Sequence, residues 1–297
     1  DLKPAHLGDS FTKIYNNIFQ ERKGIPKADP RNYVYKIILN STYGLSNEEN
    51  SYLYDPLFTM SITINGQLSI LMLVEMLTLA IPEIKIYQEN TDGVTIGYTP
   101  DKKQVVHDIC REWERITKLE LENNFYKQMI IVDVNNYVAV DTKGKIKRKG
   151  LFEYQLDYHK NHSFLIIPKA LEAYFVNEID YKQFIKSHTI FSDFFGAVKG
   201  KNDFEINLYS IENREFIKQK QQKVCRYYIS NKGGKLIKDY YDGRQVSVEA
   251  SSVCNTINDI KGVESFDINY NYYIQATRKI INLIEKPKVI QTSLIFN

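Results

Sequence analysis

Apolar residues recur at helical spacing in three stretches of the first 120 residues. Asp29-Pro30 has the form of an N-cap followed by proline at the first helical position, and Gly44 stands where a glycine stop is expected. A helix is therefore predicted between them. A second helix is predicted over about 63–79, and a third over about 102–119 carries the apolar face Val106, Ile109, Cys110, Trp113 and Ile116.

Strand signals lie between and after these helices. Two runs of strand composition, 84–88 and 94–98, are separated by the turn-forming residues 89–93, which predicts a β-hairpin. Two more strands are predicted at 129–134 and 137–140, followed by a turn at 142–144. The first half of the chain thus combines helices with antiparallel strands, which is the α+β class.

The pattern after residue 151 is mixed and predicts a mostly helical region. Helices are expected over about 169–178 and 211–224, and a last one over 271–284 is expected to end before Pro287. The Asn231-Lys232-Gly233-Gly234 sequence predicts a hairpin turn between strands.

Composition sets few limits on function. The 297 residues are 43% hydrophobic, enough for a sizeable core, and the net charge of +3 permits nucleic-acid binding without requiring it. Three well-separated cysteines without a C-x-x-C pair favour a reducing compartment over a disulfide framework or a zinc site. The most apolar run, 68–81, contains Glu75 and is too short to span a bilayer, so no membrane association is expected.

The strongest chemical signal is the string Lys36-Ile37-Ile38-Leu39-Asn40-Ser41-Thr42-Tyr43-Gly44. Lys36, Asn40 and Tyr43 are four and three residues apart, so they share one helix face that can contact phosphate, sugar and base together. The string resembles the K-x-x-x-N-S-x-Y-G motif of family B (alpha-like) DNA polymerases at every fixed position.

This resemblance implies a nucleotide site. Lys36 would bind the triphosphate of the incoming dNTP, and Asn40 would line the pocket. Tyr43 would pack under the sugar and exclude a ribose 2′-OH. Arg22 lies upstream, where the family has a phosphate-gripping arginine.

A second signal is the expected hairpin tip, Gln88-Glu89-Asn90-Thr91-Asp92-Gly93. A carboxylate held at such a tip suits Mg²⁺, which prefers few, hard, well-placed oxygen ligands. The tip resembles the family pattern Y-G-D-T-D-S, with Asp92 as the metal-binding aspartate, whereas Asn90 and Gly93 depart from it. The resemblance implies two Mg²⁺ ions in the complete enzyme, with Asp92 and Lys36 as catalytic residues.

A third signal lies in Asn135-Asn136-Tyr137 and the basic run 143–150, whose four cations between Lys145 and Lys149 predict a strip that follows phosphates. It resembles the family's K-x-Y strand and K-G step, which hold the primer terminus. Asn135 stands where lysine is usual. The implied contacts with primer and template are Asn135, Tyr137, Lys147, Lys149 and Gly150.

The resemblance implies a right-hand polymerase of viral or phage type. Helical fingers would cover 1–50, the C-terminal part of an antiparallel-sheet palm 51–150, and a mostly helical thumb 151–297. The partners would be primed DNA, dNTPs and an upstream palm or exonuclease segment of the same polypeptide, in the host cytoplasm or at a viral replication site. The family's other catalytic aspartate lies in D-x-x-S-L-Y-P, a string that residues 1–297 lack, so this fragment is expected to be inactive alone.

Two alternatives stay open. A degenerate polymerase-like subunit would grip primed DNA without chemistry, and Asn90, Gly93 and Asn135 favour it. A reverse-transcriptase-like palm would carry Y-x-D-D at the hairpin, which this sequence does not have.

Overall fold

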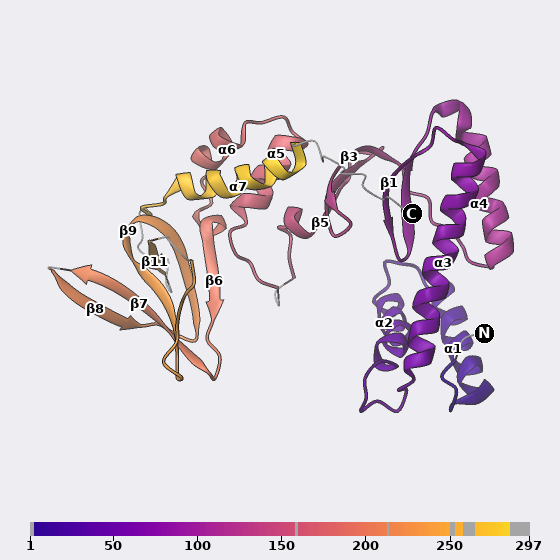
Figure 1. Ribbon diagram of the computed structural model, residues 1–297, viewed down its shortest axis with the longest axis horizontal. Helices are drawn as coiled ribbons and strands as arrows, with labels where there is room; N and C mark the ends of the chain where they lie inside the picture. The colour runs from indigo at the N-terminus through magenta and orange to yellow at the C-terminus, as the bar shows by residue number, and fades with distance from the viewer. Residues whose placement is uncertain (1–2, 158–159, 213, 250–252, 258–264, 286–297) are drawn as a thin grey trace, which may run out of the picture. The chain divides into compact units, whose positions relative to one another are not determined.

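The computed structural model describes residues 3–157, 160–212, 214–249, 253–257 and 265–285. The chain divides into two compact units, 1–123 and 124–297, and each is considered by itself. We call them unit 1 and unit 2 (Figure 1).

Unit 1 packs four helices with one β-hairpin (Figure 1). Its core lies between α3 and α4, where Leu73, Leu77 and Val106 surround Trp113, whose indole N–H donates to the carbonyl of Ser69 at 2.6 Å. The elements are α1 (Gly8–Lys23), α2 (Pro30–Leu45), α3 (Pro56–Ala80), β1 (Lys85–Asn90), β2 (Gly93–Gly97), the 3-10 turn η1 (Pro100–Lys102) and α4 (Lys103–Thr117).

The starts of α2 and α3 follow one local rule. Asp29 caps α2 by accepting from the N–H of Arg31, and Asp55 caps α3 by accepting from the N–H of Phe58 at 3.0 Å. Both caps are followed by proline at the first helical position. The predicted start of the second helix at residue 63 was therefore about two turns too late.

The end of α2 differs from the prediction. Gly44 lies inside the helix and does not have a positive φ, so it is not a left-handed glycine stop. The helix continues to Leu45, and Ser46 forms its C-cap. The side chain of Ser46 is fully buried and hydrogen-bonded, which suits a helix end that packs against a neighbouring element.

Unit 2 contains two antiparallel sheets and three helices (Figure 1). A three-stranded sheet has the order β3-β4-β5, and a six-stranded sheet has the path β10-β9-β7-β8, with β6 and β11 also paired to β9. The elements are β3 (Tyr126–Asp133), β4 (Asn136–Asp141), β5 (Ile146–Lys149), η2 (Gly150–Phe152), α5 (Ile166–Phe175), α6 (Tyr181–Ser187), η3 (Phe191–Phe194), β6 (Phe195–Lys199), β7 (Phe204–Glu212), β8 (Glu215–Lys220), β9 (Val224–Tyr240), β10 (Gln245–Ser247), β11 (Cys254–Thr256) and α7 (Tyr270–Glu285).

The core of unit 2 joins the helices to the larger sheet. Tyr273 of α7 is fully buried, donates its hydroxyl to the carbonyl of Phe194 at 2.7 Å and accepts from the N–H of Ile229 at 3.0 Å. The last helix is confirmed at Tyr270–Glu285, and Pro287 lies outside the described residues. The helix predicted at 169–178 starts three residues earlier, at Ile166.

The expectation of a mostly helical region after residue 151 was wrong. The segment 211–224, predicted as a helix, forms the end of β7, all of β8 and the first residue of β9. Phe204, Ile206 and Leu208 are buried at every second position, which is the strand period. Lys218 and Lys220 are two residues apart and share one face of β8.

The predicted hairpin at residues 231–234 was also wrong, because β9 runs through it as one 17-residue strand. The first half of β9 pairs with β6 and β11, and the second half pairs with β7 and β10. Gly233 has φ +146°, and a Cβ on Gly234 would lie 2.5 Å from the carbonyl oxygen of Tyr209. The glycines therefore permit the neighbouring strands to approach closely at the middle of β9.

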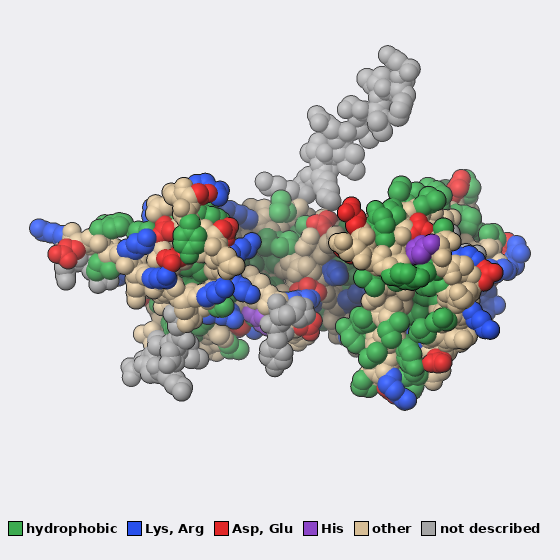
Figure 2. Space-filling view, turned by 90° about the horizontal axis from the view of Figure 1, so that it is seen from below, with side chains coloured by type: hydrophobic (Ala, Val, Ile, Leu, Met, Phe, Trp, Pro, Cys, Tyr) green, Lys and Arg blue, Asp and Glu red, His purple; other side chains and the backbone are tan. Residues whose placement is uncertain are grey.

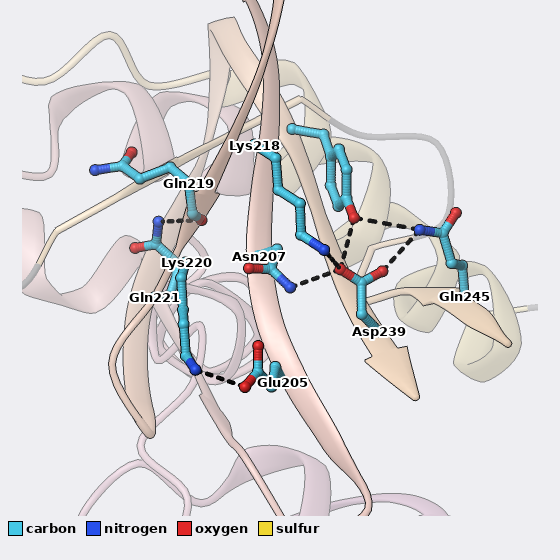
Figure 3. A network of polar contacts seen from close by, with 9 residues as sticks. Glu205, Asn207, Lys218, Gln219, Lys220, Gln221, Asp239 and Gln245 are labelled. Carbon is cyan, nitrogen blue, oxygen red and sulfur yellow. Dashed lines mark hydrogen bonds and ion pairs between the residues drawn. The ribbon is translucent and has the colours of Figure 1, made fainter. Parts of the chain in front are cut away.

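A polar network ties four strands of the larger sheet together (Figure 3). The carboxylate of Asp239 on β9 accepts from Asn207 and Tyr209 of β7, each at 2.6 Å, and from Gln245 of β10 at 2.7 Å. Lys218 of β8 completes the network with an ion pair at 3.0 Å. Burial raises the pKa of Asp239, but the hydrogen bonds from these partners outweigh it and hold the pKa below its ordinary value of 3.8.

We expect Asp239→Asn to lower the free energy of unfolding by about 1–2 kcal/mol at neutral pH, because charged hydrogen bonds would be lost. Because the folded pKa is depressed, the carboxylate stabilises the fold above its unfolded pKa. This difference between wild type and variant should shrink as pH falls through the folded pKa. Urea unfolding between pH 7 and pH 3, with the exposed Asp203→Asn as control, measures it; a pH-independent difference would contradict this role.

Candidate functional site

One face of α2 carries the residues that the sequence singled out. Lys36, Asn40 and Tyr43 follow one another at helical spacing, and all three side chains are exposed. Asn32, four residues before Lys36, extends the same row but is buried. This row on α2, which we call the α2 row, thus begins at the buried side chain of Asn32 and ends at the exposed phenol of Tyr43.

Asn32 connects this row to α1, a link that the sequence did not reveal. Its side-chain oxygen accepts from the Nε of Arg22 at 3.3 Å, and its amide nitrogen donates to the carbonyls of Arg22 at 3.3 Å and Ile25 at 2.7 Å. The structure therefore places Arg22 at the end of the row that leads to Lys36. An amide in register with Lys36 and Asn40 was the one signal in the sequence that pointed to Asn32.

The other end of the row is fixed on α3. The hydroxyl of Tyr43 lies 2.9 Å from the hydroxyl of Thr63. One turn earlier on α3, the buried hydroxyl of Thr59 lies 2.6 Å from that of Ser46. The Ser46 hydroxyl also donates to the carbonyl of Tyr43 at 2.7 Å. These contacts hold the phenol of Tyr43 against the N-terminal half of α3.

The predicted hairpin is confirmed and has a tighter turn than expected. Asn90 pairs with Gly93 across β1 and β2, so only Thr91 and Asp92 form the connection. The carboxylate of Asp92 is exposed at this tip. The side chain of Asn90 accepts from the N–H of Asp92 at 3.3 Å, so Asn90 supports the turn that presents the carboxylate.

The hairpin tip approaches α3 close to the Tyr43 contact. A Cβ on Gly66 would lie 3.7 Å from the carbonyl oxygen of Thr91, the residue before Asp92. Gly66 is three residues after Thr63, which is one helical turn along α3. The N-terminal half of α3 therefore brings together Tyr43 from one sequence motif and the Asp92 turn from the other.

The carboxylate that the sequence singled out for metal binding in this region is Asp92. Among the described residues, no three His, Cys, Asp or Glu side chains gather into a group that could hold a metal ion. Mg²⁺ is commonly bound by one or two protein carboxylates together with substrate phosphates and water. Asp92 fits as one such ligand, and further oxygens would have to come from a nucleotide or another segment.

In unit 2, three of the predicted primer contacts gather on one face of the three-stranded sheet. Tyr137 of β4 is directly opposite Lys149 of β5, and Lys147 is two residues before Lys149 on the same face. The Lys147 ammonium lies 5.7 Å from the centre of the Tyr137 ring. Burial lowers the pKa of Lys147, but contacts with Tyr137 and Tyr126 outweigh it and raise the pKa, so the ammonium stays charged.

Arg148 does not belong to this exposed face, which corrects the expected strip of four cations. It lies between Lys147 and Lys149 on β5 and therefore points to the opposite face, where it pairs with Glu172 of α5. Period-two alternation of the strand explains the difference. The sequence run of cations contributes Lys147 and Lys149 to one surface and Arg148 to the interior.

Gly150 and Asn135 meet where β5 ends. Gly150 has φ +57°, and a Cβ there would lie 2.3 Å from the carbonyl oxygen of Asn135 and 2.2 Å from the side-chain oxygen of Asn136. Asn136 also accepts from the N–H of Leu151 at 2.9 Å. Gly150 is therefore required by backbone packing, while the Asn135 side chain is exposed at the turn beside it.

Charge divides unequally between the two units. Unit 1 has 13 Lys and Arg against 17 Asp and Glu, a net charge of −4. Unit 2 has 26 against 19, a net charge of +7, and Figure 2 shows Lys and Arg side chains spread over it. The modest overall charge of +3 conceals one markedly basic unit.

No known protein family and no curated protein matches this chain at the level of sequence. Its structure is similar to that of the family B DNA polymerase from the hyperthermophilic archaeon Pyrobaculum calidifontis, with a TM-score of 0.50 and 13% sequence identity. The match covers 94% of this chain and 37% of the archaeal enzyme, so the chain spans just over a third of that polymerase. At this identity the likeness shows the fold alone: the chain has a polymerase-like α+β fold with antiparallel sheets.

Proposed function

We propose that the chain is the fingers, C-terminal palm and thumb portion of a family B DNA polymerase of viral or phage type. Its reaction would be template-directed transfer of a nucleotide from a dNTP to a primer 3′-OH. The observation that carries the proposal is the meeting on α3 of the Tyr43 end of the α2 row with the Asp92 hairpin. The polymerase-like fold supports it.

The α2 row supplies groups suited to an incoming dNTP. Lys36 and Arg22 offer cations for its triphosphate, and Asn40 offers an amide beside them. Tyr43, held by Thr63, would pack under the sugar and crowd a ribose 2′-OH. Asp92 would hold Mg²⁺, and in the complete enzyme two such ions would activate the primer 3′-OH and neutralise the triphosphate.

Unit 2 is suited to hold primed DNA. Its net charge of +7 favours a polyanion. The exposed face with Tyr137, Lys147 and Lys149 offers an aromatic ring and two cations for the primer strand. Asn135 and Gly150 would lie at the edge of this contact.

An upstream palm segment of the same polypeptide is the partner we propose for α3. One side of this helix exposes an apolar stripe in which each side chain is between 46% and 74% exposed, and Figure 2 shows hydrophobic side chains gathered over unit 1. The stripe consists of Leu57, Met60, Ile64, Leu68 and Leu71. Such a segment would also bring the second carboxylate that two-metal catalysis needs.

Membrane insertion is the competing explanation for this stripe. By length and composition alone, the 25-residue α3 could cross a membrane, and it is the one such helix in the described part of the chain. Its C-terminal half, however, packs on α4 through Leu73 and Leu77. We therefore favour a protein segment as the cover.

A DNA-binding subunit without catalysis is the second candidate function. Asn90, Gly93 and Asn135 stand where the polymerase pattern has aspartate, serine and lysine. Asn90 supports the turn in the structure, and an aspartate could do the same. The exposed Asp92 carboxylate at the tip favours the enzyme.

We expect the protein that carries its upstream segment to extend a primed template with dNTPs and Mg²⁺, and Asp92→Asn to reduce the rate at least about 100-fold, the usual cost of losing a group that acts in the transition state. Primer binding should be unchanged. Residues 1–297 alone should not extend the primer. Extension by residues 1–297 alone would contradict the proposal that the upstream segment supplies the second catalytic carboxylate. Primer binding without extension by the longer protein would favour the DNA-binding subunit.

We expect Asn32→Ala to weaken dNTP binding roughly fivefold, because Arg22 would lose a partner whose hydrogen bonds are worth about 1 kcal/mol. Titration calorimetry with Mg²⁺ and dNTP, using the exposed Asn47→Ala as control, measures the effect. If Asn32 acts through Arg22, the losses in Asn32→Ala and Arg22→Ala will not add in the double variant. Fully additive losses would show that the two residues act independently.

A further inference from the structure

The buried side of the three-stranded sheet holds a charged residue in a place where apolar residues predominate. Arg148 of β5 is directly opposite Val138, which is 1% exposed, and its own side chain is 16% exposed. Buried cations are rare unless they are paired. The position of Arg148 therefore calls for a partner that is itself held in place.

Glu172 of α5 is that partner, and both of its oxygens are occupied. One oxygen accepts from the Nη2 of Arg148 at 2.8 Å and from the hydroxyl of Tyr154 at 2.9 Å, and the other accepts from the Nε of Arg148. This two-pronged geometry fixes the orientation of the guanidinium as well as its position. The carboxylate side chain is only 9% exposed.

Further contacts fix the surroundings of the pair. The guanidinium carbon of Arg148 lies 4.6 Å from the centre of the Tyr154 ring, which also faces the ammonium of Lys169 at 5.6 Å. Lys169 in turn pairs with buried Asp193 at 2.6 Å. A chain of polar contacts therefore runs from β5 through α5 to η3.

The pair controls which way the neighbouring lysines point. Lys147 and Lys149 flank Arg148 on a strand, so fixing Arg148 inward fixes both lysines outward beside Tyr137. β5 has four residues, and within the described part of the chain it pairs along one side, with β4. Ile146, two residues before Arg148 and on the same face, also packs against the core of unit 2, so this apolar contact and the ion pair together set the orientation of the strand.

We propose that Arg148 and Glu172 are positioning residues that hold β5 so that Lys147 and Lys149 meet DNA phosphates. Neither residue touches DNA in this arrangement, and the inference rests on the DNA contact proposed above. Buried ion pairs contribute little net stability, but they can specify one arrangement of a chain. The Arg148–Glu172 pair would therefore set the positions of the two lysines, while the lysines supply the positive charge that meets the phosphates.

Glu172→Gln separates positioning from charge, because the two predict opposite signs. Removing an acidic side chain makes unit 2 more basic, so charge alone predicts tighter DNA binding and a steeper salt dependence. Positioning predicts binding weakened about tenfold and a salt slope smaller by about two, one unit for each displaced lysine. Fluorescence anisotropy with a primed duplex at several salt concentrations measures both. The exposed Glu178→Gln is the matched control and should tighten binding slightly.

If Glu172→Gln fails to fold, Glu172→Asp replaces it in the DNA-binding experiment. This variant keeps the net charge and moves the carboxylate away from Arg148 by shortening the side chain by one methylene. Binding weakened several-fold with unchanged charge would support positioning, and wild-type affinity would overturn it.

Hydrogen exchange at the amides of Ile146–Lys149 in the Glu172 variants gives a readout without DNA. Faster exchange there, with exchange in β9 unchanged, is expected. If wild type does not bind primed DNA, the proposed function fails, while the exchange result still decides whether the pair holds β5; unchanged exchange would overturn the inference.

Discussion

The buried hydrogen bond between Ser46 and Thr59 is the contact on which the rest of the candidate site depends. It joins the C-cap of α2 to the second turn of α3, with 2.6 Å between two hydroxyls and no exposure of Ser46. Each hydroxyl also contacts a backbone carbonyl, Ser46 that of Tyr43 at 2.7 Å and Thr59 that of Asp55 at 3.3 Å, so the contact belongs to a small polar network between the two helices. The bond therefore fixes the last turn of α2, and with it Tyr43, at one place along α3. Because Gly66 of the same helix faces the turn that carries Asp92, α3 sets the separation between the phenol and the carboxylate.

The two units use different secondary structure to bring polar side chains to one face. Unit 1 lines them along a helix, where spacings of three and four residues bring Asn32, Lys36 and Tyr43 to one face. Unit 2 uses the two-residue period of a strand, which sends Lys147 and Lys149 to the surface and turns Arg148 inward. In both units a buried polar contact holds the row in place. These contacts hold defined polar groups at the surface of each unit.

The sequence predicted those features that depend on local chemistry. The Asp29-Pro30 start of α2 and the hairpin around Asp92 are encoded by residues next to one another, and both were found. The segment 211–224 was predicted as a helix, whereas antiparallel pairing between β7 and β8 makes most of it strand. Gly233-Gly234 has the composition of a turn, and only the close approach of β7 at Tyr209 shows why glycine is needed inside β9. The links from Asn32 to Arg22 and from Glu172 to Arg148 join different secondary-structure elements, so they depend on how those elements pack and not on a local pattern.

Our central claim is that the α2 row and the Asp92 turn form one nucleotide site on α3. The most direct measurement is paramagnetic broadening of amide resonances by Mn²⁺, used in place of Mg²⁺, in the presence of a dNTP. We predict broadening around Gly93, Lys36 and Tyr43 together, and its loss in Asp92→Asn. Broadening that leaves Lys36 and Tyr43 unaffected, or that persists in Asp92→Asn, would contradict the account.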